Sequence, residues 1–154
     1  MDKQTATAEC GCGGEEGCTP GFWKNHPDCW CDTYTTKTLV SDVWTALQDP
    51  NYADYSDSKC DFDKDTLMDA LNYGGGRGLE GAVRNMLRHA TAALLNACNN
   101  NVDYPIGEAL IIDLGNAALA TEDVDIIQEL HGVLAEWNEY GCPINAHCEP
   151  EEDE

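Results

Sequence analysis

A stretch near the start of the chain, Cys18 to Cys31, constrains the fold more than any other part of the sequence. It contains three cysteines, three large aromatic residues and two prolines. Its apolar residues follow neither a helical nor a strand repeat, and each proline restricts itself and the residue before it. We therefore expect a rigid, cross-linked loop whose aromatic side chains are buried against the rest of the chain.

Nine cysteines in 154 residues favour disulfide bonds, and therefore an oxidising compartment. The closest pairs, Cys10 with Cys12 and Cys29 with Cys31, have one intervening residue, whereas zinc ribbons and thioredoxin-like sites normally need two. An intracellular metal-thiolate protein is the alternative. Because nine is an odd number, at least one thiol stays free, binds a ligand or pairs with another chain.

The chain is strongly acidic, with 29 Asp and Glu against eight Lys and Arg and a formal net charge of −21. Such a charge repels nucleic acid and anionic membranes, and it suits cations, basic partners or a salty medium. The simpler interpretation is that the acidic residues keep a secreted or halophilic protein soluble. Residues 1–8 lack the apolar core of a secretory signal, and no apolar run is long enough to insert into a membrane.

Helical patterns separated by short polar connections dominate the rest of the chain. The longest runs from Leu79 to Cys98 and has one broad apolar face, with Arg84 and Arg88 placed together to anchor surrounding acids. The other patterns are 38–47, a short segment capped by Asp63, 107–120, and 124–137 after a cap at 121–123.

These patterns predict an all-α domain, a small bundle of about five helices that carries the cross-linked N-terminal loop. We assign residues 18–148 to this single domain. A flexible arm rich in Cys and Gly precedes it at 1–17, and an acidic disordered tail follows at 149–154.

The sequence Cys18-Thr-Pro-Gly-Phe-Trp-Lys-Asn-His26 resembles the opening of a family of secreted prokaryotic modules. That family begins with Cys-Thr-Pro-Gly-aromatic-Trp-Lys and occurs as single domains or within larger surface proteins. Two later stretches resemble its remaining signatures. We call 18–26, 87–97 and 134–143 the first, second and third signatures. The resemblance implies an extracellular or cell-surface location and no particular activity.

The resemblance also implies one disulfide bond. Cys18 begins the first signature and Cys142 lies at the end of the third, so a bond between them would tie the loop to the last helix. In the chain-entropy description, closing so long a loop stabilises the fold by about 4–5 kcal/mol. The pairing of the other cysteines stays open.

A metal centre is the sharpest hypothesis for a site. His26 and His89 are the two histidines within the signatures, and they would meet if the loop packs on the long helix. A cysteine or a carboxylate such as Asp28 could then complete a zinc or copper site. In the alternative interpretation, each histidine makes a buried hydrogen bond that fixes its own segment.

A second metal hypothesis concerns calcium at Asp61, Asp63 and Asp65, which have the spacing of the first ligands of an EF-hand loop. The match fails where that loop needs glycine and a bidentate Glu, since Thr66 and Asn72 occupy those positions. A capped helix start is the simpler interpretation of these acids.

The sequence contains no assembled catalytic motif, so we do not expect an enzyme. We predict a secreted, disulfide-stabilised acidic structural or interaction module, suited to be a subunit of an extracellular assembly. It would bind protein partners, or itself through an unpaired cysteine, but neither nucleic acid nor the membrane interior. The alternative is a metal-binding protein for zinc, copper or calcium.

Overall fold

The structure, a computed structural model, describes residues 14–150. Over this range the chain forms α-helices, two short 3₁₀ helices and isolated backbone bridges in place of strands, which confirms the all-α prediction. None of the described helices is long and apolar enough to cross a membrane. The elements are α2 (Pro20–Asn25), η1 (Pro27–Cys29), α3 (Val40–Val43), η2 (Thr45–Gln48), α4 (Pro50–Ala53), α5 (Leu67–Leu71), α6 (Gly78–Cys98), α7 (Glu108–Thr121) and α8 (Val124–Asn138).

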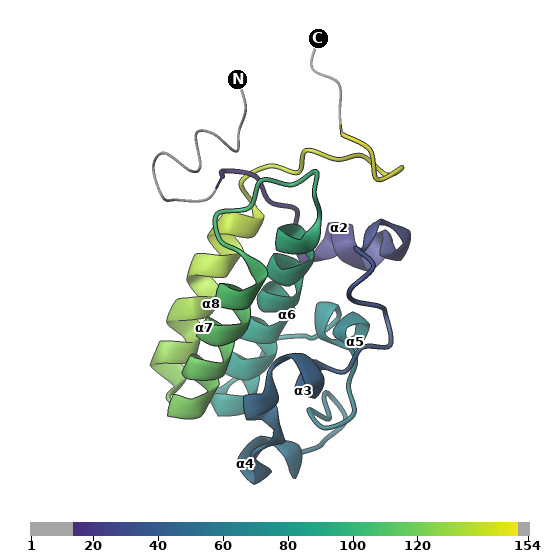
Figure 1. The fold of residues 1–154 in the computed structure, drawn as a ribbon. Coiled ribbons are helices and arrows are strands. Elements are labelled where there is room, and N and C mark those ends of the chain that lie inside the picture. Colours follow the sequence, from purple (N-terminus) through teal and green to yellow (C-terminus); the bar gives the residue numbers. More distant parts are fainter. Residues whose placement is uncertain (1–13, 151–154) are drawn as a thin grey trace.

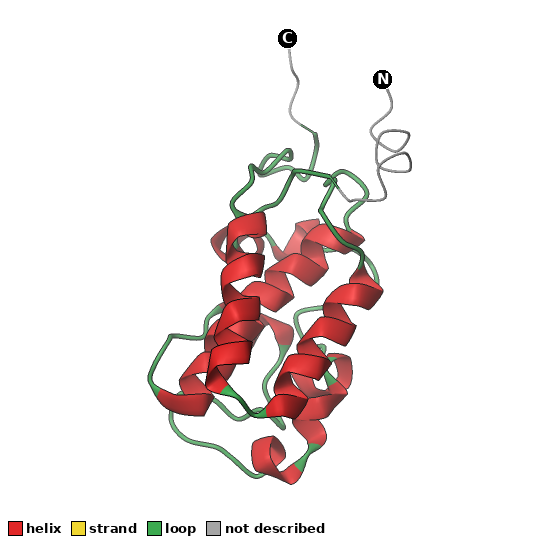
Figure 2. Ribbon diagram, turned by 90° about the vertical axis from the view of Figure 1, so that its left-hand side faces the viewer, coloured by secondary structure: helices red, strands yellow, loops and turns green. Residues whose placement is uncertain are grey.

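Helix α6 is the centre of the fold. It contacts the α7–α8 hairpin on one side and the short helices α2 and α5 on another (Figures 1 and 2). The prediction of a single apolar face was therefore too narrow, because 14 of its 21 residues are buried. Its small residues allow this close packing: a side chain at Gly81 would collide with the carbonyl of Gly76.

The first loop is partly helical, which corrects the prediction for residues 18–31. Thr19 caps α2, since its hydroxyl accepts a hydrogen bond from the Phe22 N–H, and Pro20 occupies the first helical position. The expected burial of the aromatic side chains is confirmed for Trp23 and Trp30.

The predicted helix at 38–47 is two short pieces, α3 and η2, which meet at Trp44. The segment after it, for which no helical pattern was predicted, contains α4. Asp49 caps α4 by accepting from the Asn51 N–H, and Pro50 again stands at the first position. A cap and a following proline thus begin both α2 and α4.

Helix α5 is capped by Thr66, and not by Asp63 as predicted. The Thr66 hydroxyl accepts from the Asp69 N–H at 3.1 Å, and the Asp69 carboxylate accepts from the Thr66 N–H at 2.9 Å. This reciprocal capping box satisfies two of the backbone donors at the helix start.

Within residues 14–150, three disulfide bonds join segments that are far apart in sequence. They lie at the end of the bundle where α6 and α8 terminate and where the chain enters and leaves (Figure 1). The bond implied by the family resemblance is present among them. The pairs are Cys18–Cys142, Cys29–Cys148 and Cys31–Cys98.

Of the remaining cysteines, Cys60 is a buried free thiol. Cys10 and Cys12 lie outside the described residues, as do most of the predicted arm and residues 151–154 of the predicted tail.

Hydrogen-bonded structure extends beyond the predicted domain limits. Residues 14–17 fall in the predicted arm, yet the Glu16 N–H donates to the Asp103 carbonyl at 3.0 Å and Gly17 forms an antiparallel bridge with Gly141. At the other end, Pro150 forms a bridge with residue 144.

Two glycines in the long helices should respond oppositely to replacement by alanine. A Cβ at Gly115 would collide with the fully buried Trp44 indole, so Gly115→Ala should lower the free energy of unfolding by about 1–3 kcal/mol. At Gly132 a Cβ meets open space, so Gly132→Ala should raise it by about 1 kcal/mol. Urea denaturation measures both. Equal effects would contradict the packing of α7 against Trp44.

Candidate functional site

The two histidines of the metal hypothesis lie in separate environments. The His26 ring packs on Phe22, with ring centres 4.5 Å apart. The His89 ring lies instead beside His131, at 5.1 Å, and is bonded to Asn138. Within residues 14–150, neither histidine belongs to a group of three possible metal ligands. His89 matches the alternative that we gave, a buried hydrogen bond.

The three aspartates of the calcium hypothesis form a turn that leads toward α5. The Asp65 carboxylate accepts from the Asp61 N–H at 2.8 Å and from the Tyr73 hydroxyl at 2.7 Å. The Asp61 carboxylate accepts from the Asp63 N–H at 3.2 Å. The described residues do not gather these three carboxylates into a common group of ligand atoms.

One group of three potential ligands does occur within residues 14–150. Asp28, Cys29 and Cys148 place one ligand atom each within 4.8 Å of one another. Cys29 and Cys148 are bonded to each other, however, and a cysteine must be a free thiolate to bind a metal ion. In the oxidised protein this group therefore offers the exposed Asp28 carboxylate alone.

The Asn96 side chain in α6 connects the first signature to the core. Its Oδ1 accepts from the Cys18 N–H at 2.8 Å and from the Trp23 indole N–H at 3.2 Å. Its Nδ2 donates to the Cys18 carbonyl at 2.9 Å and to Asn138 Oδ1 at 3.1 Å. All four hydrogen-bonding positions of this fully buried amide are thus occupied.

Asn138 in α8 extends the network to the rest of the core. Its Oδ1 also accepts from the Tyr104 hydroxyl at 2.7 Å, and its Nδ2 donates to the His89 carbonyl at 3.0 Å. The three signatures therefore meet in one buried network. We call its members the asparagine network: Cys18, Trp23, His89, Asn96, Tyr104 and Asn138.

The asparagine network fixes the protonation of His89. The Asn138 Nδ2 lies 3.3 Å from His89 Nδ1, and because Nδ2 is a donor, Nδ1 accepts and the ring proton is on Nε2. Burial, assisted by the nearby charge of Arg88 and by His131, lowers the pKa of His89 to about 4. The ring is therefore neutral at neutral pH, as its position in the core requires.

The glycine run 74–76 binds a side chain of the protein itself. The buried Arg84 donates from Nε to the Gly74 carbonyl and from a terminal nitrogen to the Gly75 carbonyl, both at 3.1 Å. We predicted acidic partners for Arg84, but these bonds go to backbone carbonyls. Its other terminal nitrogen lies 3.7 Å from Cys60 Sγ. Burial nevertheless raises the pKa of Cys60, so this thiol stays protonated.

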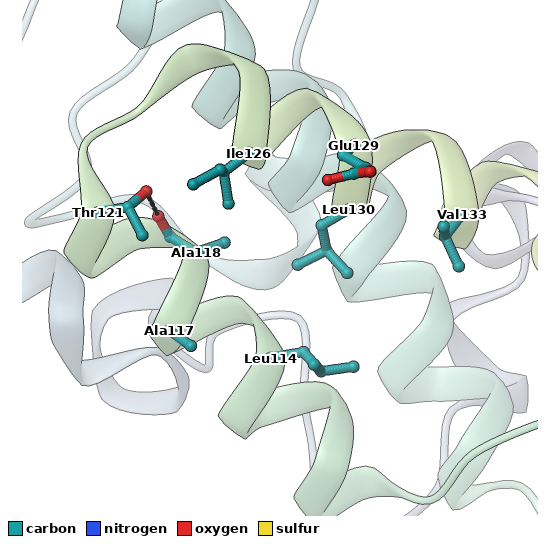
Figure 3. A pocket seen from close by; sticks show the side chains of 8 residues that line it. All are labelled: Leu114, Ala117, Ala118, Thr121, Ile126, Glu129, Leu130 and Val133. Carbon is teal, nitrogen blue, oxygen red and sulfur yellow. Dashed lines mark hydrogen bonds between the residues drawn. The ribbon is translucent and has the colours of Figure 1, made fainter.

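An apolar groove lies between α7 and α8 (Figure 3). Its volume is about 420 Å³, and among the described residues that line it Glu129 alone is charged. The Thr121 hydroxyl donates to the Ala118 carbonyl at 2.6 Å and is thereby occupied within α7. The lining residues are Leu114, Ala117, Ala118 and Thr121 of α7, and Ile126, Glu129, Leu130 and Val133 of α8.

The groove was not identified from the sequence, although its signal was present. The pattern of α7 has two apolar sides, one with Leu110 and Leu114 and one with Ile111 and Ala118. The structure buries the second side and leaves Leu110 46% exposed. A helix with two apolar sides and one side buried leaves the other for a contact.

No family model, curated protein or solved structure matches the chain. The resemblance of the three signatures to secreted modules therefore stays a prediction.

Removing a side chain of the asparagine network should lower the free energy of unfolding. Asn138→Ala leaves the Tyr104 hydroxyl, the Asn96 amide and the His89 carbonyl without their shared partner, so we expect a loss of about 3 kcal/mol in the free energy of unfolding. Asn100→Ala, at an exposed position, is the control and should change it by less than about 0.5 kcal/mol. Chemical denaturation measures both, and similar small effects would show that the network is not stabilising.

His89 should make the stability depend on pH. Its folded pKa of about 4 lies below the ordinary value of 6.5, so protonation favours the unfolded chain. The stability present above pH 6.5 should fall as pH decreases toward 4, by about 2 kcal/mol at pH 5. Urea denaturation at pH 7.5 and 5 tests this. His89→Gln should remove most of this loss, while His147→Gln, at an exposed position, should retain it.

Proposed function

We propose that the chain is a secreted, disulfide-stabilised acidic module that binds another protein outside the cell. One observation carries this proposal: within residues 14–150, three disulfides secure one end of the bundle, and the hairpin that extends away from that end has an apolar groove that these residues leave uncovered. A chain stabilised in this way can keep an apolar surface exposed without unfolding around it.

The disulfides support the extracellular location. Such bonds persist in oxidising compartments and are rare in cytosolic proteins. The bonded cysteines are separated by 124, 119 and 67 positions in the sequence, so each bond constrains much of the unfolded chain.

The chemistry of Cys60 and His89 argues against a catalytic role for these two residues. A nucleophilic cysteine is exposed and has a lowered pKa, but Cys60 is buried and its pKa is raised. A general base titrates near neutral pH, but His89 is buried and its pKa is lowered to about 4.

Metal binding is the weaker alternative. The group that favours it, Asp28 with Cys29 and Cys148, gains its thiolates only if the disulfide is reduced. It therefore belongs to a reducing environment and is incompatible with the location proposed above.

Fewer cysteines are available for a covalent bond between two copies of the chain than the sequence suggested. Cys60 is 5% exposed, so this thiol cannot reach another chain while the domain is folded. A link between chains would have to use Cys10 or Cys12, which lie outside the described residues.

Peptide mapping tests the proposed compartment. Native protein is alkylated in denaturant, which blocks its free thiols, and is then digested without reductant. We expect an alkylated Cys60 and three disulfide-linked peptide pairs, Cys18–Cys142, Cys29–Cys148 and Cys31–Cys98. Alkylation of all of these cysteines in native material would refute the extracellular proposal.

Replacing both Cys18 and Cys142 by alanine should lower the free energy of unfolding by about 4–5 kcal/mol, because the loop that their bond closes is lost.

A further inference from the structure

The outer side of the α7–α8 hairpin is apolar where a surface helix is normally polar. In α8, Ile127 is fully buried, yet the neighbouring Ile126 is 42% exposed and Val133 is 39% exposed. On α7, Leu110 is also exposed. Most of the large exposed apolar side chains within residues 14–150 therefore gather on one hairpin, and such a patch marks a contact surface.

The shape of the groove suits a helix. Its two walls, 114–121 and 126–133, are antiparallel segments of about two turns, or about 10 Å each. Large side chains of both walls frame the groove, and Figure 3 shows Leu114 opposite Leu130 and Val133. A partner helix anchors in such a groove through apolar residues one turn apart.

The charge around the groove selects the partner. No Lys or Arg occurs from residue 89 to the end of the chain, so the hairpin has no cationic side chain. Its exposed carboxylates include Asp113, Asp125 and Glu129, the last within the groove lining. A helix that lies here meets an apolar floor with anionic surroundings, and this arrangement attracts Lys and Arg.

The chain itself provides no matching occupant. Residues 1–13 have Met1 as their one large apolar residue apart from cysteine, and residues 151–154 are all acidic. A second copy would place two cation-free hairpins against each other, with like charges opposed. A positively charged segment of a different protein fits both the floor and its surroundings.

We propose that the α7–α8 groove binds a cationic amphipathic helix of another protein. Its apolar residues would pack on Leu114, Leu130 and Val133, and its Lys or Arg residues would pair with Glu129 and neighbouring carboxylates. This inference rests on the proposed binding function and adds the class of partner.

A designed peptide tests the inference directly. The probe is a fluorescein-labelled helix of about 14 residues, with Leu on one face and Lys elsewhere. Fluorescence anisotropy with the oxidised full chain at about 0.15 M salt should show saturable binding. Two control peptides should bind at least about tenfold more weakly: one with Glu in place of Lys, and one of equal charge with its Leu residues scattered.

Exposed lining residues provide the first variant. Ile126→Ser combined with Val133→Ser should weaken binding of the Lys peptide by about tenfold or more, because the apolar floor is lost. The matched control is Tyr140→Ser, which removes a side chain of similar exposure outside the groove and should leave the affinity unchanged.

A charge reversal provides a second variant that leaves the apolar floor intact. Glu129→Lys should weaken binding of the Lys peptide and strengthen binding of the Glu peptide. Asp63→Lys makes the same change of net charge at an exposed position outside the hairpin. If the groove is the site, Asp63→Lys should change the affinity for each peptide less than Glu129→Lys does.

Several results would overturn the inference: no binding of the Lys peptide, equal binding of the Lys and Glu peptides, or equal affinity of the wild type and the serine variant. Salt-induced dimerisation that the serine variant abolishes would assign the groove to a second copy instead.

Peptide mapping of the same material separates the two proposals. Intact disulfides without peptide binding reject the partner class alone, whereas reduced cysteines reject the extracellular module.

Discussion

The pairing of the Asn96 amide with the Cys18 backbone is the interaction on which the rest of the structure depends. A buried amide with all four positions used tolerates a single arrangement, because any shift leaves a polar group unpaired in the interior. It fixes where the chain enters the bundle, and it places Trp23 against α6 and Cys18 within bonding distance of Cys142. The disulfide makes permanent a geometry that the hydrogen bonds specify.

The long helices could be predicted because their apolar repeat extends over many turns. The predicted start of the longest, Leu79, differs from the observed start of α6 by one residue. Helices α2 and α4 span six and four residues, too few for a repeat to be visible. Their signal was chemical: Thr19 and Asp49 are capping residues, and each precedes a proline that suits the first helical turn.

The site was less predictable because it depends on how helices pack. A sequence places His89 and Asn96 on one helix but does not show that Asn138 will lie beside both. Nor does it tell which apolar side of α7 is turned inward. That choice follows from Gly115, whose missing side chain lets the helix approach the Trp44 indole.

The position of the Cys18–Cys142 bond has a mechanical consequence. Helices α2 to α8 all lie within the loop that this bond closes. Tension applied between the two ends of the chain passes from Cys18 to Cys142 through a covalent bond and bypasses the helices. A pull on the two ends would therefore leave the groove between α7 and α8 unchanged in shape.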